Sequence, residues 1–257
     1  MMQINEIKRT MEEIANPGLA VEWDNPGMQV NVGMPGIESV LIALDVTTAV
    51  IEEAKAKKAG LIIAHHPLIF SNLKSVDCNT VTGNLIIELI KSGISVYSAH
   101  TNFDEAPGGN NDYIASVLGL VNVKKLEAGS FGRIGEFPSE MTLAEAGDFI
   151  KETLELKYLK TVGDPDAVIK KVGLCSGAGG DMISAAISEG CDLFVTGDVK
   201  HHEALGAAEK GICVIDAGHY GTEKIFVKNL AAKLTEMTKG KLEIIESATE
   251  IDPFRIP

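Results

Sequence analysis

The chain has 257 residues, of which 45% are hydrophobic and 23% are charged, and its formal net charge at pH 7 is −13. This size and balance predict an ordinary globular protein with one large domain or two lobes. The negative charge argues against general binding to the phosphates of nucleic acids. No apolar run suits a signal sequence or a membrane span, so we expect a cytoplasmic protein with no membrane partner.

Four cysteines occur, without the Cys-x-x-Cys spacing of a zinc or redox motif. Cys175, Cys191 and Cys213 lie in or beside apolar runs. Buried free thiols are therefore favoured over disulfides or zinc ligands.

Short apolar runs alternate with helical patterns in the first half of the chain. Residues 40–44, 61–64 and 94–97 are predicted to be buried strands. The first of the two segments between them has its glutamates before its lysines, as a helix favours, and the two segments end at Gly60 and Gly93, as helices often do. This order is typical of βαβ units and of a parallel sheet.

The same order recurs in the second half, which indicates an internal duplication. The recurring strands are predicted at residues 171–175, 193–196 and 212–215. A helix over residues 223–238 and a strand at 242–245 are predicted to close the chain. The fold predicted is α/β, with two pseudo-repeated lobes at residues 1–126 and 127–257 built on mixed or parallel sheets. The C-terminal helix could pack back on the first lobe.

Two adjacent histidines, His65 and His66, directly follow the predicted strand at 61–64 and precede Pro67. Open α/β sheets bind their ligands at this end of the strands. Because strand side chains alternate between faces, the two rings should diverge unless the backbone turns at Pro67. One core histidine and one surface histidine would be the ordinary explanation, but the paired position favours a functional site.

In each half, the third predicted strand is followed by a histidine and, four residues later, by an acidic residue. His100 and Asp104 follow the strand at 94–97, and His219 and Glu223 follow the strand at 212–215. The two pairs occupy corresponding places in the repeat. We therefore expect both pairs to belong to one site.

The candidate metal ligands are thus imidazole and carboxylate groups without thiolate: His65, His66, His100, Asp104, His219 and Glu223. This donor set suits zinc, manganese, iron, cobalt or nickel. One ion rarely needs six protein ligands, whereas two ions about 3.5–4 Å apart would use them all. We therefore predict two divalent ions per subunit in a site between the halves. With one bridging hydroxide the site would keep a net positive charge, which favours an anionic small-molecule substrate.

Other polar groups give weaker indications of a role in the site. Asp198 and His202, with His201 and Glu203 beside them, follow a predicted strand where the repeat places the first histidine pair. They are candidates for proton transfer, although a polar helix start explains them slightly better.

Two turns that contain glycine each allow a structural and a functional explanation. The amides at Gly177, Gly179 and Gly180 could hold a phosphate, but a tight turn would look the same. The turn at residues 22–27 holds the only tryptophan and an Asp-Asn pair, and it is either a structural corner or the wall of a pocket.

These motifs resemble the NGG-interacting-factor-three family, whose members are often labelled GTP cyclohydrolase 1 type 2. The resemblance rests on His65-His66-Pro67, His100-x-x-x-Asp104, Gly218-His219-x-x-x-Glu223 and residues 22–25 and 175–180. It covers nearly the whole chain, at the length of the short form that lacks an inserted middle domain. It implies a two-lobed α/β subunit, a dinuclear metal site in the cleft and a toroidal homohexamer. The ligands implied are His65, His66, Asp104, His219 and Glu223, with His100 as a sixth ligand or a neighbour of the site.

Two functions follow as hypotheses. The first is a metal-dependent hydrolase of a small anionic or heterocyclic, nucleotide-like substrate, similar to GTP cyclohydrolase 1 type 2. The second is a non-enzymatic metal-binding regulatory or scaffold protein. Open coordination positions would favour the enzyme, and metals saturated by protein ligands would favour the alternative.

Overall fold

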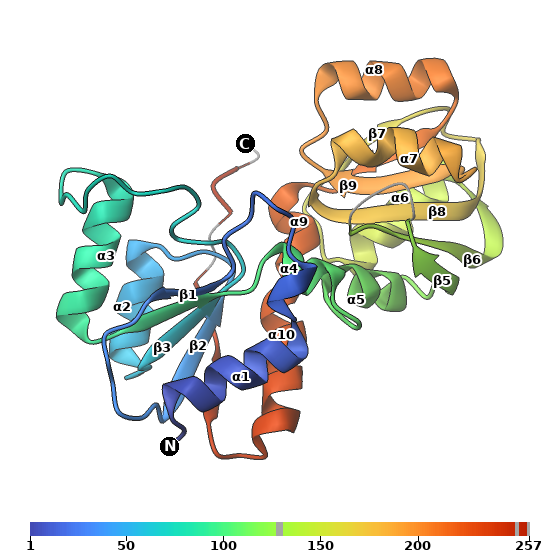
Figure 1. The fold of residues 1–257 in the computed structure, drawn as a ribbon. Coiled ribbons are helices and arrows are strands. Elements are labelled where there is room, and N and C mark those ends of the chain that lie inside the picture. Colours follow the sequence, from blue (N-terminus) through green and yellow to red (C-terminus); the bar gives the residue numbers. More distant parts are fainter. Residues whose placement is uncertain (127–130, 250–251, 256–257) are drawn as a thin grey trace. The chain divides into compact units, whose positions relative to one another are not determined.

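The strands form one five-stranded and one six-stranded sheet in the computed structural model, which describes residues 1–126, 131–249 and 252–255 (Figure 1). The chain divides into two compact units, each built on one of these sheets. The first unit comprises Met1–Ala106 and Phe226–Pro257, and the second comprises Pro107–Ile225. The mixed α/β fold with two sheets agrees with the sequence-based expectation.

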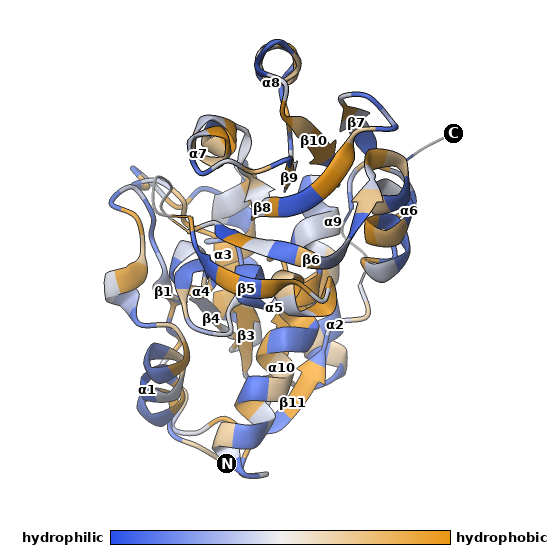
Figure 2. Ribbon diagram, turned by 90° about the vertical axis from the view of Figure 1, so that its right-hand side faces the viewer, coloured by the Kyte–Doolittle hydropathy of each residue, from blue (hydrophilic) through white to orange (hydrophobic). Residues whose placement is uncertain are grey.

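The sheet of the first unit has the strand order β1-β4-β3-β2-β11. Strands β2 (Ser39–Ala43), β3 (Leu61–Ala64), β4 (Ser95–Ser98) and β11 (Glu243–Glu246) are parallel, and β1 (Gly27–Val30) pairs antiparallel with β4. Strands β2, β3 and β4 are buried throughout, as predicted for a sheet covered on both faces. Figure 2 accordingly shows β3 as hydrophobic.

The helices of the first unit are α1 (Ile4–Ile14), the short η1 (Pro17–Leu19), α2 (Thr48–Ala56), α3 (Val81–Ser92), α4 (Thr101–Glu105) and α10 (Ile225–Thr238). Alternate residues of β2 and β3, among them Leu41 and Ile62, share one apolar cluster with residues of α2 and α3, such as Ile51 and Leu89. Helices α1 and α10 lie on the opposite side of this sheet from α2 and α3 (Figure 1).

The sheet of the second unit has the order β5-β6-β8-β9-β10-β7. Its strands are β5 (Val121–Lys125), β6 (Arg133–Thr142), β7 (Lys160–Val162), β8 (Val168–Ala178), β9 (Leu193–Gly197) and β10 (Cys213–Asp216). Strands β8, β9 and β10 are parallel to one another, and the other pairings are antiparallel. Its helices are α5 (Asn110–Val117), α6 (Leu143–Thr153), the short η2 (Gly180–Met182), α7 (Ile183–Ser188), α8 (His201–Lys210) and α9 (His219–Glu223).

The two units share one order of elements. In the first, β2, β3 and β4 alternate with α2 and α3 and lead into α4; in the second, β8, β9 and β10 alternate with α7 and α8 and lead into α9. An antiparallel strand flanks the last strand of each series, β1 beside β4 and β7 beside β10. The order of elements that the sequence suggested to be repeated is thus present in both sheets.

The unit boundaries differ from the predicted lobes at 1–126 and 127–257. Residues from Pro107 onward belong to the second unit because α5 packs into its core through Ile114 and because β5 pairs with β6. The C-terminal chain returns to the first unit because β11 pairs with β2. The predicted boundary also adjoins residues 127–130, which lie outside the described part of the chain.

Two further predictions concern the last helix and the cysteines. The helix predicted over 223–238 is divided, because α9 ends at Glu223 and α10 begins at Ile225. Cys175, Cys191 and Cys213 are buried and free, as predicted, and burial raises the pKa of the Cys191 thiol to about 11. No helix in the described ranges has the length and apolar character needed to cross a bilayer.

Candidate metal centre

Three histidines of the first unit converge just beyond its parallel strands. His65 and His66 follow β3, and His100 follows β4 at the start of α4. One ring nitrogen from each lies within 4.8 Å of the others. The ring centroids of His65 and His66 are 5.2 Å apart, and those of His66 and His100 are 5.5 Å apart. These distances suit a shared metal ion.

His65 and His66 do not diverge, because the strand ends before them and the chain bends ahead of Pro67. Strand β3 stops at Ala64, and the backbone N–H groups of both histidines donate to the carbonyl oxygen of Leu44, at 3.1 and 3.0 Å. The chain therefore bends at His65, where strand alternation no longer applies.

Each of these histidines is fixed at Nδ1. His65 Nδ1 lies 2.8 Å from the carbonyl oxygen of Ala99, His66 Nδ1 lies 2.8 Å from Asp45, and His100 Nδ1 lies 2.8 Å from Asp24. A carbonyl or carboxylate oxygen only accepts, so Nδ1 carries the proton and Nε2 presents its lone pair. Metal-binding histidines are typically oriented in this way.

Asp24 organises the entrance to α4. Its Oδ1 accepts from His100, and its Oδ2 accepts from the backbone N–H of Thr101 at 3.1 Å and from the Thr101 hydroxyl at 2.5 Å. Burial raises the pKa of Asp24, but the hydrogen bonds from His100 and Thr101 outweigh it and hold the pKa below its usual range. The turn at 22–27 therefore contacts the candidate ligand His100 through Asp24.

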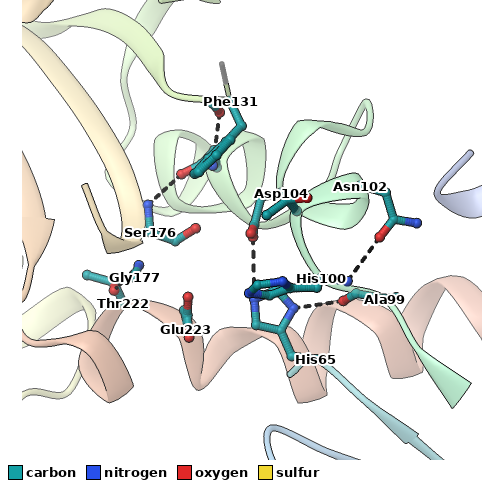
Figure 3. A network of polar contacts seen from close by, with 12 residues as sticks. His65, Ala99, His100, Asn102, Asp104, Phe131, Ser176, Gly177, Thr222 and Glu223 are labelled. Carbon is teal, nitrogen blue, oxygen red and sulfur yellow. Dashed lines mark hydrogen bonds and ion pairs between the residues drawn. The ribbon is translucent and has the colours of Figure 1, made fainter. Parts of the chain in front are cut away.

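Asp104 adds a carboxylate to the first unit's cluster. It lies one helical turn after His100, and its Oδ1 is 3.6 Å from His65 Nε2 (Figure 3). Both side chains are buried, and the His65 ring packs against Phe226 with its centroid 4.8 Å away. A buried carboxylate beside a buried imidazole is the kind of donor pair that a divalent ion would neutralise.

The second unit brings His219 and Glu223 together on α9. Glu223 is buried, and its Oε2 lies 3.0 Å from His219 Nε2. His219 Nδ1 lies 2.8 Å from Asp198, which follows β9. Asp198 therefore holds the His219 ring, as Asp45 and Asp24 hold histidines of the first unit.

Two glycines make room for this pair. A Cβ atom at Gly177, whose φ is +65°, would overlap Glu223 Oε1. A Cβ atom at Gly197 would lie 2.5 Å from the backbone nitrogen of His219. Side chains at these positions would displace the candidate ligands.

Two amides of the glycine-containing turn at the end of β8 are engaged within the protein. The Gly177 N–H donates to Thr222 Oγ1 and the Gly179 N–H donates to Thr196 Oγ1, both at 2.9 Å (Figure 3 shows the Thr222 contact). The amides of Gly177 and Gly179 are therefore not available to a phosphate, which favours the tight-turn explanation.

His201 and His202 begin α8 and are exposed, as expected of a polar helix start. Asp198, by contrast, contacts the candidate ligand His219.

The contacts of Asp24 and Asp45 with histidines were not evident from the sequence. Asp45 could have been found, because the pairing of Ala43 with Ala64 places the ends of β2 and β3 side by side. Asp24 lies 76 residues before its partner His100, and no periodic pattern connects them.

The family model of Duf34/NIF3 (NGG1p interacting factor 3) matches residues 2–253. The chain belongs to this family. A Clostridium perfringens protein named GTP cyclohydrolase 1 type 2 homolog is 38% identical and aligns over 98% of this chain and 99% of its own length. A Schizosaccharomyces pombe protein named NIF3 homolog is 34% identical, over 97% of this chain and 96% of its own. The resemblance inferred from the motifs is thereby confirmed.

The chain is a short member of the family. Its alignment with the Bacillus subtilis GTP cyclohydrolase 1 type 2 homolog spans 363 positions yet covers 97% of each chain, so that relative carries residues that this chain lacks. Solved structures share the fold. A Bacillus cereus protein related to NIF3 has a TM-score of 0.92 at 27% identity, covering 98% of both chains. Reduced HcgD from Methanocaldococcus jannaschii has a TM-score of 0.83 at 31% identity, covering 96% of this chain and 98% of its own.

Proposed function

We propose that this protein binds divalent metal ions and uses them to hydrolyse a small anionic or heterocyclic molecule. The observation that carries the proposal is the set of three histidines in the first unit, each held at Nδ1 by an oxygen that can only accept. This arrangement fixes the tautomer in which Nε2 can bind a metal before any metal arrives.

The proposed ligands of the first unit are His65, His66, His100 and Asp104, and those of the second unit are His219 and Glu223. Nitrogen and carboxylate donors without thiolate suit zinc, manganese, iron, cobalt or nickel. When bound, such an ion lowers the pKa of a water ligand and polarises a carbonyl or phosphoryl oxygen. That both sets serve one dinuclear site, and that the subunits assemble as a homohexamer, stay predictions.

The protein's own residues would act by holding the donors in place. Asp24, Asp45 and Asp198 accept from ring N–H groups at Nδ1 and hold the imidazoles in the orientation that turns Nε2 toward a metal ion. The buried Asp104 and Glu223 supply negative charge that offsets part of the charge of bound cations.

The proposed activity can be tested by a hydrolase screen of the protein loaded with manganese or zinc. The panel should hold nucleotides, including GTP because relatives carry that name, together with other phosphorylated and heterocyclic compounds. We expect turnover of an anionic substrate, competitive inhibition by phosphate, and loss of turnover in Glu223→Gln. A metal-loaded protein inactive throughout the panel would favour the regulatory or scaffold alternative, and activity only on cationic or neutral substrates would contradict the charge argument.

A further inference from the structure

Two large aromatic side chains of the first unit stay exposed beside the histidine cluster. Trp23 is 58% exposed and Phe70 is 56% exposed. Their ring centroids are 5.7 Å apart with an angle of 40° between the planes. Each ring gives up the stabilisation that burial of an aromatic side chain would bring.

Both rings contact the same candidate ligand. The Trp23 centroid lies 6.0 Å from the His100 ring at 67°, and the Phe70 centroid lies 6.3 Å from it at 69°. The aromatic pair therefore flanks the imidazole that would face a metal ion, and its exposed surface adjoins the place where chemistry would occur.

Hydrogen bonds hold the backbone of the two aromatic residues in this position. Asn25 Nδ2 donates to the carbonyl oxygen of Ile69 at 2.7 Å, which joins the turn after Trp23 to the residue before Phe70. Gln29 closes the connection, because its Nε2 donates to the Asn25 carbonyl at 2.7 Å and its Oε1 accepts from the Ile69 N–H at 3.1 Å. The exposure of the two rings is thus built into the local structure.

We propose that Trp23 and Phe70 form a stacking platform that receives a planar, heteroaromatic ring of the substrate next to His100. Aromatic side chains stack on such rings with little dependence on ring substituents, so the platform would select planarity and leave finer selection to other groups. The inference rests on the proposed function of the metal centre and narrows its substrate class to molecules that combine a planar ring with an anionic group.

Trp23 is the only tryptophan of the chain, so its fluorescence reports directly on the platform. The probes are AMP, which has a purine ring, and ribose 5-phosphate, which carries a phosphate without an aromatic ring. With metal-loaded protein and correction for absorption by the purine, we expect AMP to change Trp23 fluorescence saturably. Ribose 5-phosphate should bind more weakly and change the fluorescence little.

The variant Phe70→Ala keeps the reporter and removes half of the platform. We expect at least about a tenfold loss of AMP affinity, as is typical for removal of one stacked aromatic. Binding of ribose 5-phosphate should be unchanged. Phe254→Ala is the matched control, because Phe254 is 69% exposed and has no assigned part in the site. It should retain the affinity for AMP.

Metal content and molecular mass, measured on the same samples, separate the possible failures. Bound metal without an AMP response, or equal AMP affinity in Phe70→Ala, overturns the platform and leaves the metal site standing. Absence of bound metal in the wild type overturns the proposed function itself. A changed oligomeric mass in Phe70→Ala with unchanged AMP affinity identifies the pair as a contact between subunits, which also contradicts the platform.

Discussion

At the scale of individual residues, single hydrogen bonds fix the ring orientation of the histidines in the candidate site. Asp45 touches His66, Asp24 touches His100 and Asp198 touches His219, each through an Nδ1–oxygen contact of 2.8 Å. A carboxylate in this place favours one tautomer and raises the basicity of the nitrogen that binds the metal. These three aspartates therefore influence metal affinity without being proposed ligands themselves.

Asp45→Asn tests this influence on one histidine. The substitution keeps the size of the side chain but removes its charge, so we expect about 10- to 100-fold weaker metal binding. Competition with a chelator of known affinity measures the change. Asp148→Asn on the exposed face of α6 serves as the control. Equal affinities of Asp45→Asn and the control would show that Asp45 has no orienting role.

Gly177→Ala tests the fit around Glu223. The added methyl group would overlap Glu223 Oε1 and would sit at a positive φ that alanine rarely adopts. We expect reduced metal retention together with lower thermal stability. Gly206→Ala in α8 is the matched control, because its Cβ meets nothing within 4 Å and alanine favours the helix. Full metal retention in Gly177→Ala would mean that Glu223 is not a required ligand.

At the scale of elements, the ends of parallel strands gather the candidate ligands. The apolar runs and closing glycines were sufficient to predict β2, β3, β4, β9 and β10, and with them the positions of His100 and His219. The bend at His65 could not be predicted, since it depends on two amides that share the Leu44 carbonyl. Contacts made by residues far apart in sequence, such as that of Asp24 with His100, depend on packing that no periodicity encodes.

A second contact between elements joins α2 to the chain that follows β11. Glu53 on α2 accepts from the hydroxyl of Ser247 at 2.6 Å, from the hydroxyl of Thr249 at 2.8 Å and from the N–H of Ala248 at 2.9 Å. Burial raises the pKa of Glu53, but these hydrogen bonds, together with one from Lys57, outweigh it and lower the pKa from 4.5 to about 2.

This shift predicts an acid-dependent loss of stability. The contribution of Glu53 is fully present above its unfolded pKa near 4.5 and is lost as the pH falls toward the folded value of about 2. In the presence of a chelator, the free energy of unfolding of the wild type should therefore fall more steeply over this interval than that of Glu53→Gln. Glu52→Gln, at an exposed neighbouring side chain, should follow the wild type. Parallel curves for wild type and Glu53→Gln would contradict the prediction.

For the whole molecule, the recurring order of elements gives each unit one histidine–acid pair after its third parallel strand. His100 and Asp104 accompany α4 in the first unit, and His219 and Glu223 form part of α9 in the second. The positions of these pairs along the chain were predictable, because each directly follows an apolar strand. The unit boundaries were less predictable, because β11 pairs with β2 from the other end of the chain.

Removal of one acid from either unit tests whether both units contribute to metal binding. Asp104→Ala and Glu223→Ala should each retain less metal than the wild type, because each loses a charged donor that the other unit's pair does not replace. Both variants should still fold, since these acids lie beyond the strands that form the two cores. Circular dichroism checks folding, and elemental analysis measures the metal. Unchanged retention in either variant would assign metal binding to the other unit alone.

The metal content of the purified wild-type protein is the decisive test of metal binding. Elemental analysis should be done before and after incubation with manganese or zinc at neutral pH, with unbound metal removed by gel filtration. The donor sets of the two units predict about two divalent ions per chain, held without sulfur ligands. A chain that retains no metal after this treatment would show that the clustered histidines and acids do not form a metal site.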